Sequence, residues 1–121
     1  NRELHRQHID QLASQVVRQI EQSYADSDLS PTRIADSLGM SSAYLGRIFR
    51  ESTQISISQY LNQTRIRRAE ELLRETEQPV ETVAGLVGFS NPKYFYVVFK
   101  NITGQTPLQF RKAVHSASEK N

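Results

Sequence analysis

The sequence predicts an all-α protein with about seven helices, arranged as two helix-turn-helix subdomains joined by a linker helix. Three observations predict this class. Apolar residues recur at helical spacing in five stretches, and no stretch alternates convincingly like a β-strand. A segment of about 28 residues occurs twice, at an offset of 49 or 50 residues. Each copy places a glycine between two short helical patterns, as a helix-turn-helix does.

Composition narrows the classes of protein and site. The 121 residues suffice for one compact domain or two very small ones. There is no cysteine, which excludes disulfides and thiolate zinc sites. No apolar run approaches the ~18 residues of a membrane span and nothing resembles a signal peptide, so we expect a cytoplasmic protein without membrane contact. Because the only methionine is Met40, we expect a fragment of a longer chain. A net charge of +2 permits nucleic-acid binding without requiring it.

The first element, over residues 1–28, reads as a connector helix. Its helical pattern runs from about residue 6 to residue 25 and ends at the sequence "DSDLSP". Ser30 is suited to cap the next helix, with Pro31 at its first position. The connector's apolar stripe consists of Ile9, Leu12, Ala13, Val16, Val17, Ile20 and Tyr24.

The two predicted helix-turn-helix units cover residues 29–55 and 77–113. Gly39 and Gly88 are expected to end the first helix of each unit with a positive φ. Ser41 and Ser90 are expected to cap the second helices. The inward stripe of each second helix should pack a small core, which large rings can close. That stripe comprises Leu45, Ile48 and Phe49 in the first unit, and Phe95, Val98, Phe99 and Ile102 in the second.

The opposite face of each second helix carries the functional prediction, because in a helix-turn-helix that face enters the major groove of DNA. Arg47 can contact guanine O6 and N7, whereas Arg50 and Lys100 are better placed for phosphate. Tyr96 and Val97 offer apolar surface suited to thymine methyl groups. The alternative is that these are ordinary solvated faces. The candidate residues of this face are Ala43, Gly46, Arg47 and Arg50, with Lys93, Tyr96, Val97 and Lys100 at the matching positions.

Residues 56–76 read as the linker helix, and residues 114–121 as a disordered tail. Arg65 falls on the buried face of the linker, so it is either a structural arginine paired with a buried carboxylate or carbonyl, or a DNA ligand. A linker of about eighteen residues spans ~27 Å. Successive major grooves on one face of DNA lie ~34 Å apart. This length predicts that one chain reads two adjacent grooves.

The segments "IADSLGMSSAYLGRIFRE", "YLNQTRIRRAEELL" and "VAGLVGFSNPKYFYVVFKNITGQTPLQFRK" resemble the DNA-binding domain of AraC/XylS-type bacterial transcription regulators. The resemblance implies double-stranded DNA as a partner, contact with RNA polymerase, and a regulatory domain N-terminal to this chain, with no cofactor. Gln54 departs from the family pattern, because the matching residue in the second unit is Gly104. Whether the turn after the first reading helix has the same conformation as the turn after the second is therefore left open. The reading residues that the resemblance implies are Ser42, Ala43, Gly46 and Arg47, then Asn91, Pro92, Lys93, Tyr96 and Val97.

Two other classes of function are weaker. Related domains occur fused to DNA-repair methyltransferases, which need a cysteine acceptor that this chain lacks. His5, His8 and His115 have no carboxylate or serine constellation around them, so no catalytic or metal site is expected, although "HRQH" could be a metal pair. The remaining alternative is a helical protein-interaction adaptor that uses this fold without binding DNA.

Overall fold

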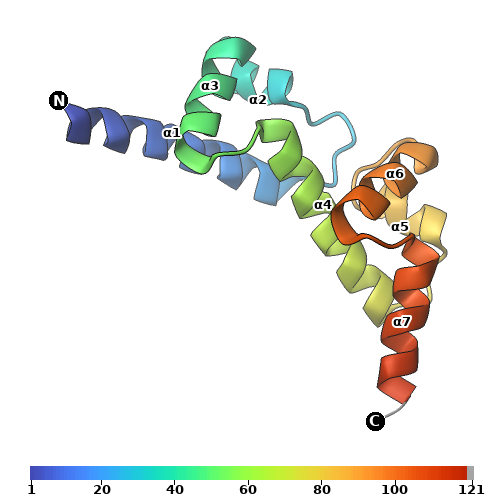
Figure 1. The fold of residues 1–121 in the computed structure, drawn as a ribbon. Coiled ribbons are helices and arrows are strands. Elements are labelled where there is room, and N and C mark those ends of the chain that lie inside the picture. Colours follow the sequence, from blue (N-terminus) through green and yellow to red (C-terminus); the bar gives the residue numbers. More distant parts are fainter. Residues whose placement is uncertain (120–121) are drawn as a thin grey trace. The chain divides into compact units, whose positions relative to one another are not determined.

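The computed structural model describes residues 1–119, and within that range the chain folds into seven α-helices without any β-strand. The predicted all-α class is therefore confirmed. The helices, drawn in Figure 1, are α1 (Arg2–Ser23), α2 (Pro31–Ser37), α3 (Ser42–Thr53), α4 (Ile57–Glu75), α5 (Val80–Leu86), α6 (Pro92–Thr103) and α7 (Pro107–Glu119).

The chain forms two compact units. The first comprises residues 1–24 and 28–62, and the second comprises residues 25–27 together with the chain from residue 63 onward. Helix α4 therefore begins in the first unit and continues in the second.

In the first unit, α1 packs along α3, and α3 packs against α2 (Figure 1). Its predicted apolar stripe supplies five buried side chains, while Val17 and Tyr24 are partly buried. The two contiguous clusters of this core are Ala13, Val16, Ile20, Ile34, Ala35, Leu45, Phe49, Ile57 and Leu61, and beside them Ile9, Leu12 and Ile48.

In the second unit, aromatic rings form the centre of the core. The ring centroids of Phe95 lie 5.2 Å from Phe89 and 5.6 Å from Phe99, and Phe99 lies 5.7 Å from Phe110 of α7. Aromatic rings contribute a large apolar area per residue, which lets a few short helices bury enough surface to be stable. These rings link the turn before α6, α6 itself and α7 through one packed row.

The same hydrogen bonds recur at the start of the helix that follows each reading helix. Ser56 and Gln59 form a reciprocal capping box, with the Ser56 amide donating to Gln59 Oε1 at 2.9 Å and the Gln59 amide donating to Ser56 Oγ at 3.0 Å. Thr106 and Gln109 form the matching pair, at 2.9 and 3.1 Å. The internal repeat of the sequence is therefore also a repeat of the structure, including the hydrogen bonds that cap these two helices.

The turn after α3 matches the turn after α6, even though only the second has glycine. Gln54 adopts a left-handed conformation with φ 73°, and Gly104 does so with φ 81°. Their backbone amides donate to the carbonyls of Arg50 and Lys100 at 2.9 and 2.8 Å. The departure at Gln54 therefore leaves the turn unchanged.

Two sequence predictions about α6 are wrong. Ser90 does not cap this helix, because the one residue inserted in the second unit moves the cap to Asn91, whose Oδ1 accepts from the Lys93 amide at 2.9 Å. Ile102 is not buried and remains 44% exposed. It lies on the inward stripe but in the last turn of α6, where the side chain extends past the small core.

The predicted disordered tail also needs correction, because α7 continues through residues 114–119. No proline or glycine interrupts the sequence after Pro107 in this helix, and Val114 is half-buried. His115 Nε2 lies 3.4 Å from the carbonyl oxygen of Arg74. Residues 120–121 lie outside the described part of the chain.

Candidate nucleic-acid interface

Helix α3 is positioned by its cap and by one buried face. Ser41 Oγ accepts from the Tyr44 amide at 3.1 Å, which satisfies a backbone donor that the first turn leaves unpaired. Leu45, Ile48 and Phe49 are buried in the core of the first unit. The helix can therefore neither rotate nor slide without exposing these apolar side chains.

Helix α6 is built in the same way within the second unit. Asn91 caps it and Pro92 occupies its first turn, where the missing amide proton of proline is not needed. Phe95, Val98 and Phe99 are buried, so they fix the orientation of the helix in its own core.

Residue for residue, the burial of positions 41–50 matches that of positions 91–100. In each stretch three residues are buried, one is half-buried, and the remaining six are exposed. Within each unit, the predicted reading residues therefore share one solvent-facing side of the second helix. The exposed members are Ser42, Ala43, Arg47, Arg50, Asn91, Pro92, Lys93, Val97 and Lys100, and the half-buried members are Gly46 and Tyr96.

On α3, the two polar side chains nearest the middle of the face have partners within the first unit. Ser42 Oγ donates to Thr32 Oγ1 of α2 at 3.4 Å. The Arg47 guanidinium lies over the Tyr44 ring, 5.6 Å from its centroid. Such stacking orients an arginine while leaving its N–H donors available for hydrogen bonds.

On α6, the face combines charge at its ends with apolar surface between them. Lys93 and Lys100 are exposed in the first and last turns, and Val97 is 56% exposed. The Tyr96 ring is anchored against Phe95, with the centroids 6.1 Å apart. This face suits contact with a partner that offers apolar edges between negatively charged groups.

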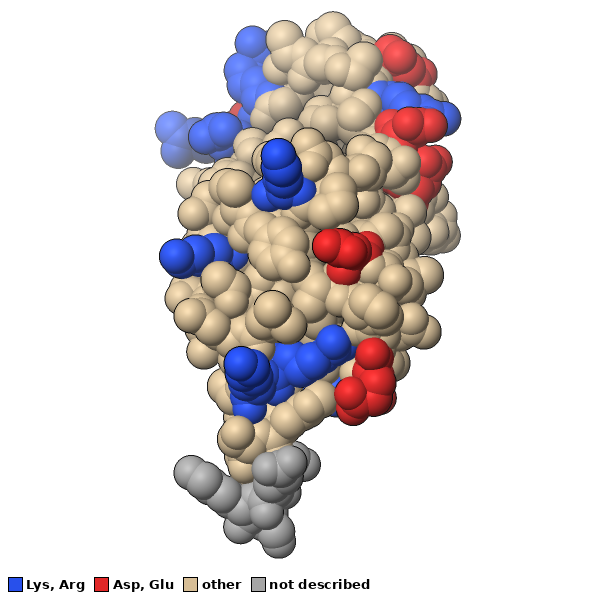
Figure 2. Space-filling model, turned by 90° about the vertical axis from the view of Figure 1, so that its right-hand side faces the viewer, with Lys and Arg blue, Asp and Glu red and all other residues tan. Residues whose placement is uncertain are grey.

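Charge is distributed unevenly between the helices. Helix α6 carries two lysines and no acidic residue, while α3 carries two arginines and one glutamate, Glu51. On the face shown in Figure 2, one group of basic side chains lies near the lower end beside acidic ones, the other basic side chains are scattered, and no single continuous patch forms. Recognition by such a surface depends on individually placed cations, which can meet phosphates at defined spacing.

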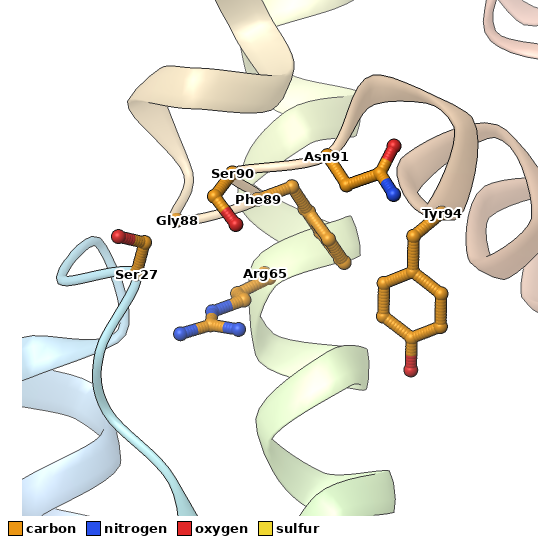
Figure 3. Close-up of a pocket in the computed structure, with 7 residues that line it drawn as sticks. All are labelled: Ser27, Arg65, Gly88, Phe89, Ser90, Asn91 and Tyr94. Carbon is orange, nitrogen blue, oxygen red and sulfur yellow. The ribbon is translucent and has the colours of Figure 1, made fainter.

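Arg65 is a buried member of a cluster of side chains beside the start of α6 (Figure 3). Its Nη2 donates to the Asp26 carbonyl oxygen at 2.9 Å, and its guanidinium lies 5.6 Å from the centroid of the Phe89 ring. Phe89 lies between Arg65 and Tyr94, and these residues line a cavity of about 320 Å³. Burial lowers the pKa of Arg65, while the charge of Asp26 acts in the opposite direction. These contacts agree with the structural alternative for Arg65.

The sequence patterns missed two exposed aromatic residues. Tyr44 and Tyr94 occupy the same position in the first turn of α3 and α6, and are 38% and 50% exposed. Their match in the repeat is visible in the sequence, but the helical spacing singled out only the inward stripe and the face opposite it. Both rings border the predicted reading faces, where an aromatic plane and a hydroxyl can contact a ligand.

The histidines give little support to the metal-pair alternative. His5 Nε2 lies 3.4 Å from Glu51 Oε1, which links α1 to α3. Among the side chains that the structure describes, no group of three histidine, aspartate or glutamate residues is arranged to hold a metal ion. None of the described helices combines the length and the apolar character needed to cross a membrane.

Comparison with known proteins agrees with this architecture. A family model described as a helix-turn-helix domain matches residues 34–113. The Msm operon regulatory protein of Streptococcus mutans is 37% identical over 100 residues, which cover 83% of this chain and 36% of that protein. The arabinose operon regulatory protein of Escherichia coli is 33% identical, over 85% of this chain and 35% of that protein. The chain thus spans about a third of the length of these relatives.

Solved structures show the same fold. The C-terminal domain of AraT, a response regulator from Geobacillus stearothermophilus, is 31% identical with a TM-score of 0.82, and the match covers 84% of each chain. The DNA-binding domain of AdpA, solved in complex with a target DNA, is 26% identical with a TM-score of 0.80, over 91% of this chain and 97% of that one.

Proposed function

This chain belongs to the AraC/XylS-type family of helix-turn-helix proteins, and we propose that it is the DNA-binding part of a transcription regulator that reads two adjacent major grooves with α3 and α6. The supporting observation is the identical exposure of residues 41–50 and 91–100 around two separate cores. A scaffold that repeats one exposed helix face with its caps and turns is suited to a ligand that repeats its own grooves.

The residues on the two faces take different roles in this proposal. Arg47, oriented by Tyr44, contacts guanine O6 and N7 through its fork of donors. Arg50 and Lys100, one turn further along their helices, neutralise phosphates. Tyr96 and Val97 meet apolar base edges, of which the thymine methyl is the example in the major groove. Lys93 at the start of α6 completes the reading set.

The proposal of two grooves is also supported by the length of α4. Its 19 residues span about 28 Å along the helix axis. This length approaches the ~34 Å between successive major grooves on one face of a duplex.

The family also suggests partners for the whole protein. We propose that a regulatory domain lies N-terminal to this chain, that the protein contacts RNA polymerase at promoters, and that it works in the cytoplasm. The relatives, about three times as long as the matched region, leave room for such a domain. Copurification of RNA polymerase with the full-length protein on promoter DNA tests the contact, and its absence in the presence of bound DNA would contradict it.

Selection of binding sites from a pool of random duplexes tests the DNA-binding function. We expect the chain to enrich one sequence, with an affinity that falls as salt rises by a slope of about −0.9 for each phosphate neutralised. A matched variant with Arg50→Gln and Lys100→Gln should show a slope smaller by about two. Failure of the wild-type chain to retain any duplex at low salt would favour the protein-interaction adaptor.

A further inference from the structure

Gly46 lies in the interior of α3 without a reason inside the chain. Glycine is among the least favourable residues in a helix interior. The backbone conformation at position 46 does not require glycine, because Gly46 does not have a positive φ. Its packing does not require glycine either, since a Cβ built at this position meets no atom within 4 Å. The space above Gly46 is open on the predicted reading face.

The second unit shows that this architecture accepts a large side chain at the same position. Gly46 corresponds to Tyr96 in α6, which has the same length, cap position and burial pattern as α3. The only other helical glycine with open space, Gly85, is the penultimate residue of α5, where helix propensity matters less. The open space at position 46 is therefore available to a ligand that approaches α3 from outside.

The chemical character of this surface follows from its neighbours. The Ser42 hydroxyl bonds to Thr32, and the Arg47 guanidinium stacks on Tyr44. The backbone amides and carbonyls around Gly46 are bonded within the helix. Between Ser42 and Arg47, the surface consists of the Ala43 methyl and the Gly46 backbone, so this part of the face complements an apolar group.

We propose that Gly46 is a specificity-determining residue, which lets the α3 backbone approach the 5-methyl group of a thymine beside the base that Arg47 contacts. The thymine methyl is the apolar group that base pairs present in the major groove. A side chain at position 46 would occupy the volume of that methyl. This inference rests on the proposed DNA binding by α3, and it adds selection of thymine by steric fit.

The test uses the whole chain and the duplex that the wild-type protein selects. Thymines in the half of the site contacted by the first unit are replaced one at a time by uracil, which lacks only the methyl group. We expect one replacement to weaken wild-type binding by about three- to fivefold, as for one buried methylene. Gly46→Ala should weaken binding to the thymine duplex by about tenfold, because the added methyl overpacks the contact. On the uracil duplex the same variant should lose much less.

Gly85→Ala is the matched control, since it also fills open space on a helix and should leave both affinities unchanged. Gly46→Ala should raise Tm by about 2–5 °C, which separates a lost contact from a lost fold. Equal loss on the thymine and uracil duplexes, or no loss on either, would overturn the inference while DNA binding stands. Absence of wild-type binding to any duplex would overturn the proposed function and this inference with it.

Discussion

Among single residues, the arginines of this chain fall into two environments. Arg47 and Arg50 are exposed on α3, where their charges can reach a ligand. Arg65 is only 7% exposed, donates to a backbone carbonyl and lies against the Phe89 ring. A buried arginine in such contacts holds its surroundings together, because removing it loses a charge-assisted hydrogen bond and the packing against the ring. Arg65 thereby ties residues 25–27 to the start of the second reading helix.

Arg65→Met should therefore destabilise the second unit by about 1–3 kcal/mol. The methionine keeps most of the apolar volume but loses the hydrogen bond that Arg65 donates to the Asp26 carbonyl. Urea unfolding followed by circular dichroism measures the loss. Arg67→Met, on the exposed side of the same helix, is the control and should change stability little. No pH dependence from Arg65 is expected between pH 5 and 9. Burial lowers the pKa of its guanidinium, but an arginine in a protein stays protonated throughout this range. Equal effects of the two variants would contradict the structural role of Arg65.

Among the turns, the one after α3 is the strained member of a matched pair. Gln54 holds φ at 73°, a region that favours glycine, and gains only the bond from its Nε2 to the Glu51 carbonyl at 3.2 Å. Gly104 makes the same turn without a Cβ. The rest of the unit therefore imposes this conformation on Gln54, since the local preference of glutamine opposes it.

Gln54→Gly should stabilise the protein, by roughly 0.5–1 kcal/mol, because relief of the strain exceeds the added freedom of the unfolded chain. The reverse change, Gly104→Ala, should destabilise the chain by at least as much even though no atom lies within 4 Å of the added Cβ. Differential scanning calorimetry of both variants measures the two shifts. A lower Tm for Gln54→Gly would show that the side-chain bond outweighs the strain.

The sequence predicted the helices well where a capping residue and the spacing of the core residues indicated the same start. Ser30 followed by Pro31 marked the start of α2, and Ser41 marked the start of α3. The apolar spacing of α3 was correct because both copies of the repeat carried it. The cap of α6 was predicted one residue too early. The apolar pattern aligned the two copies of the repeat, and it does not show on which side of the cap the one-residue insertion lies. Burial of Ile102 was wrong because helical spacing gives the direction of a side chain but not where a small core ends.

At the scale of the whole molecule, the repeat duplicates the scaffold but not the reading residues. Position 46 in the first unit is glycine and its counterpart, Tyr96, is an aromatic residue, while Arg47 corresponds to Val97. Identical frames with different side chains predict two half-sites of different sequence. The sequence could predict the frame because core residues follow a period. It could not predict that Tyr44 and Tyr94 are partly exposed. The exposure of an aromatic residue depends on its packing, which the spacing of apolar residues does not reveal.

Footprinting on the selected duplex should therefore show protection in two major grooves about one helical turn apart, with each half depending on one unit. Arg47→Ala should weaken binding by about 1–3 kcal/mol and remove protection from one groove, because the guanine contact is lost while the second unit stays bound. Val97→Asp should remove protection from the other groove, because it places a negative charge where α6 meets DNA. Ser116→Ala, on the exposed surface of α7, is the control and should leave both halves protected. Protection of a single groove by the wild-type chain, or loss of both halves with either variant at saturating protein, would mean that the two units do not read the duplex independently.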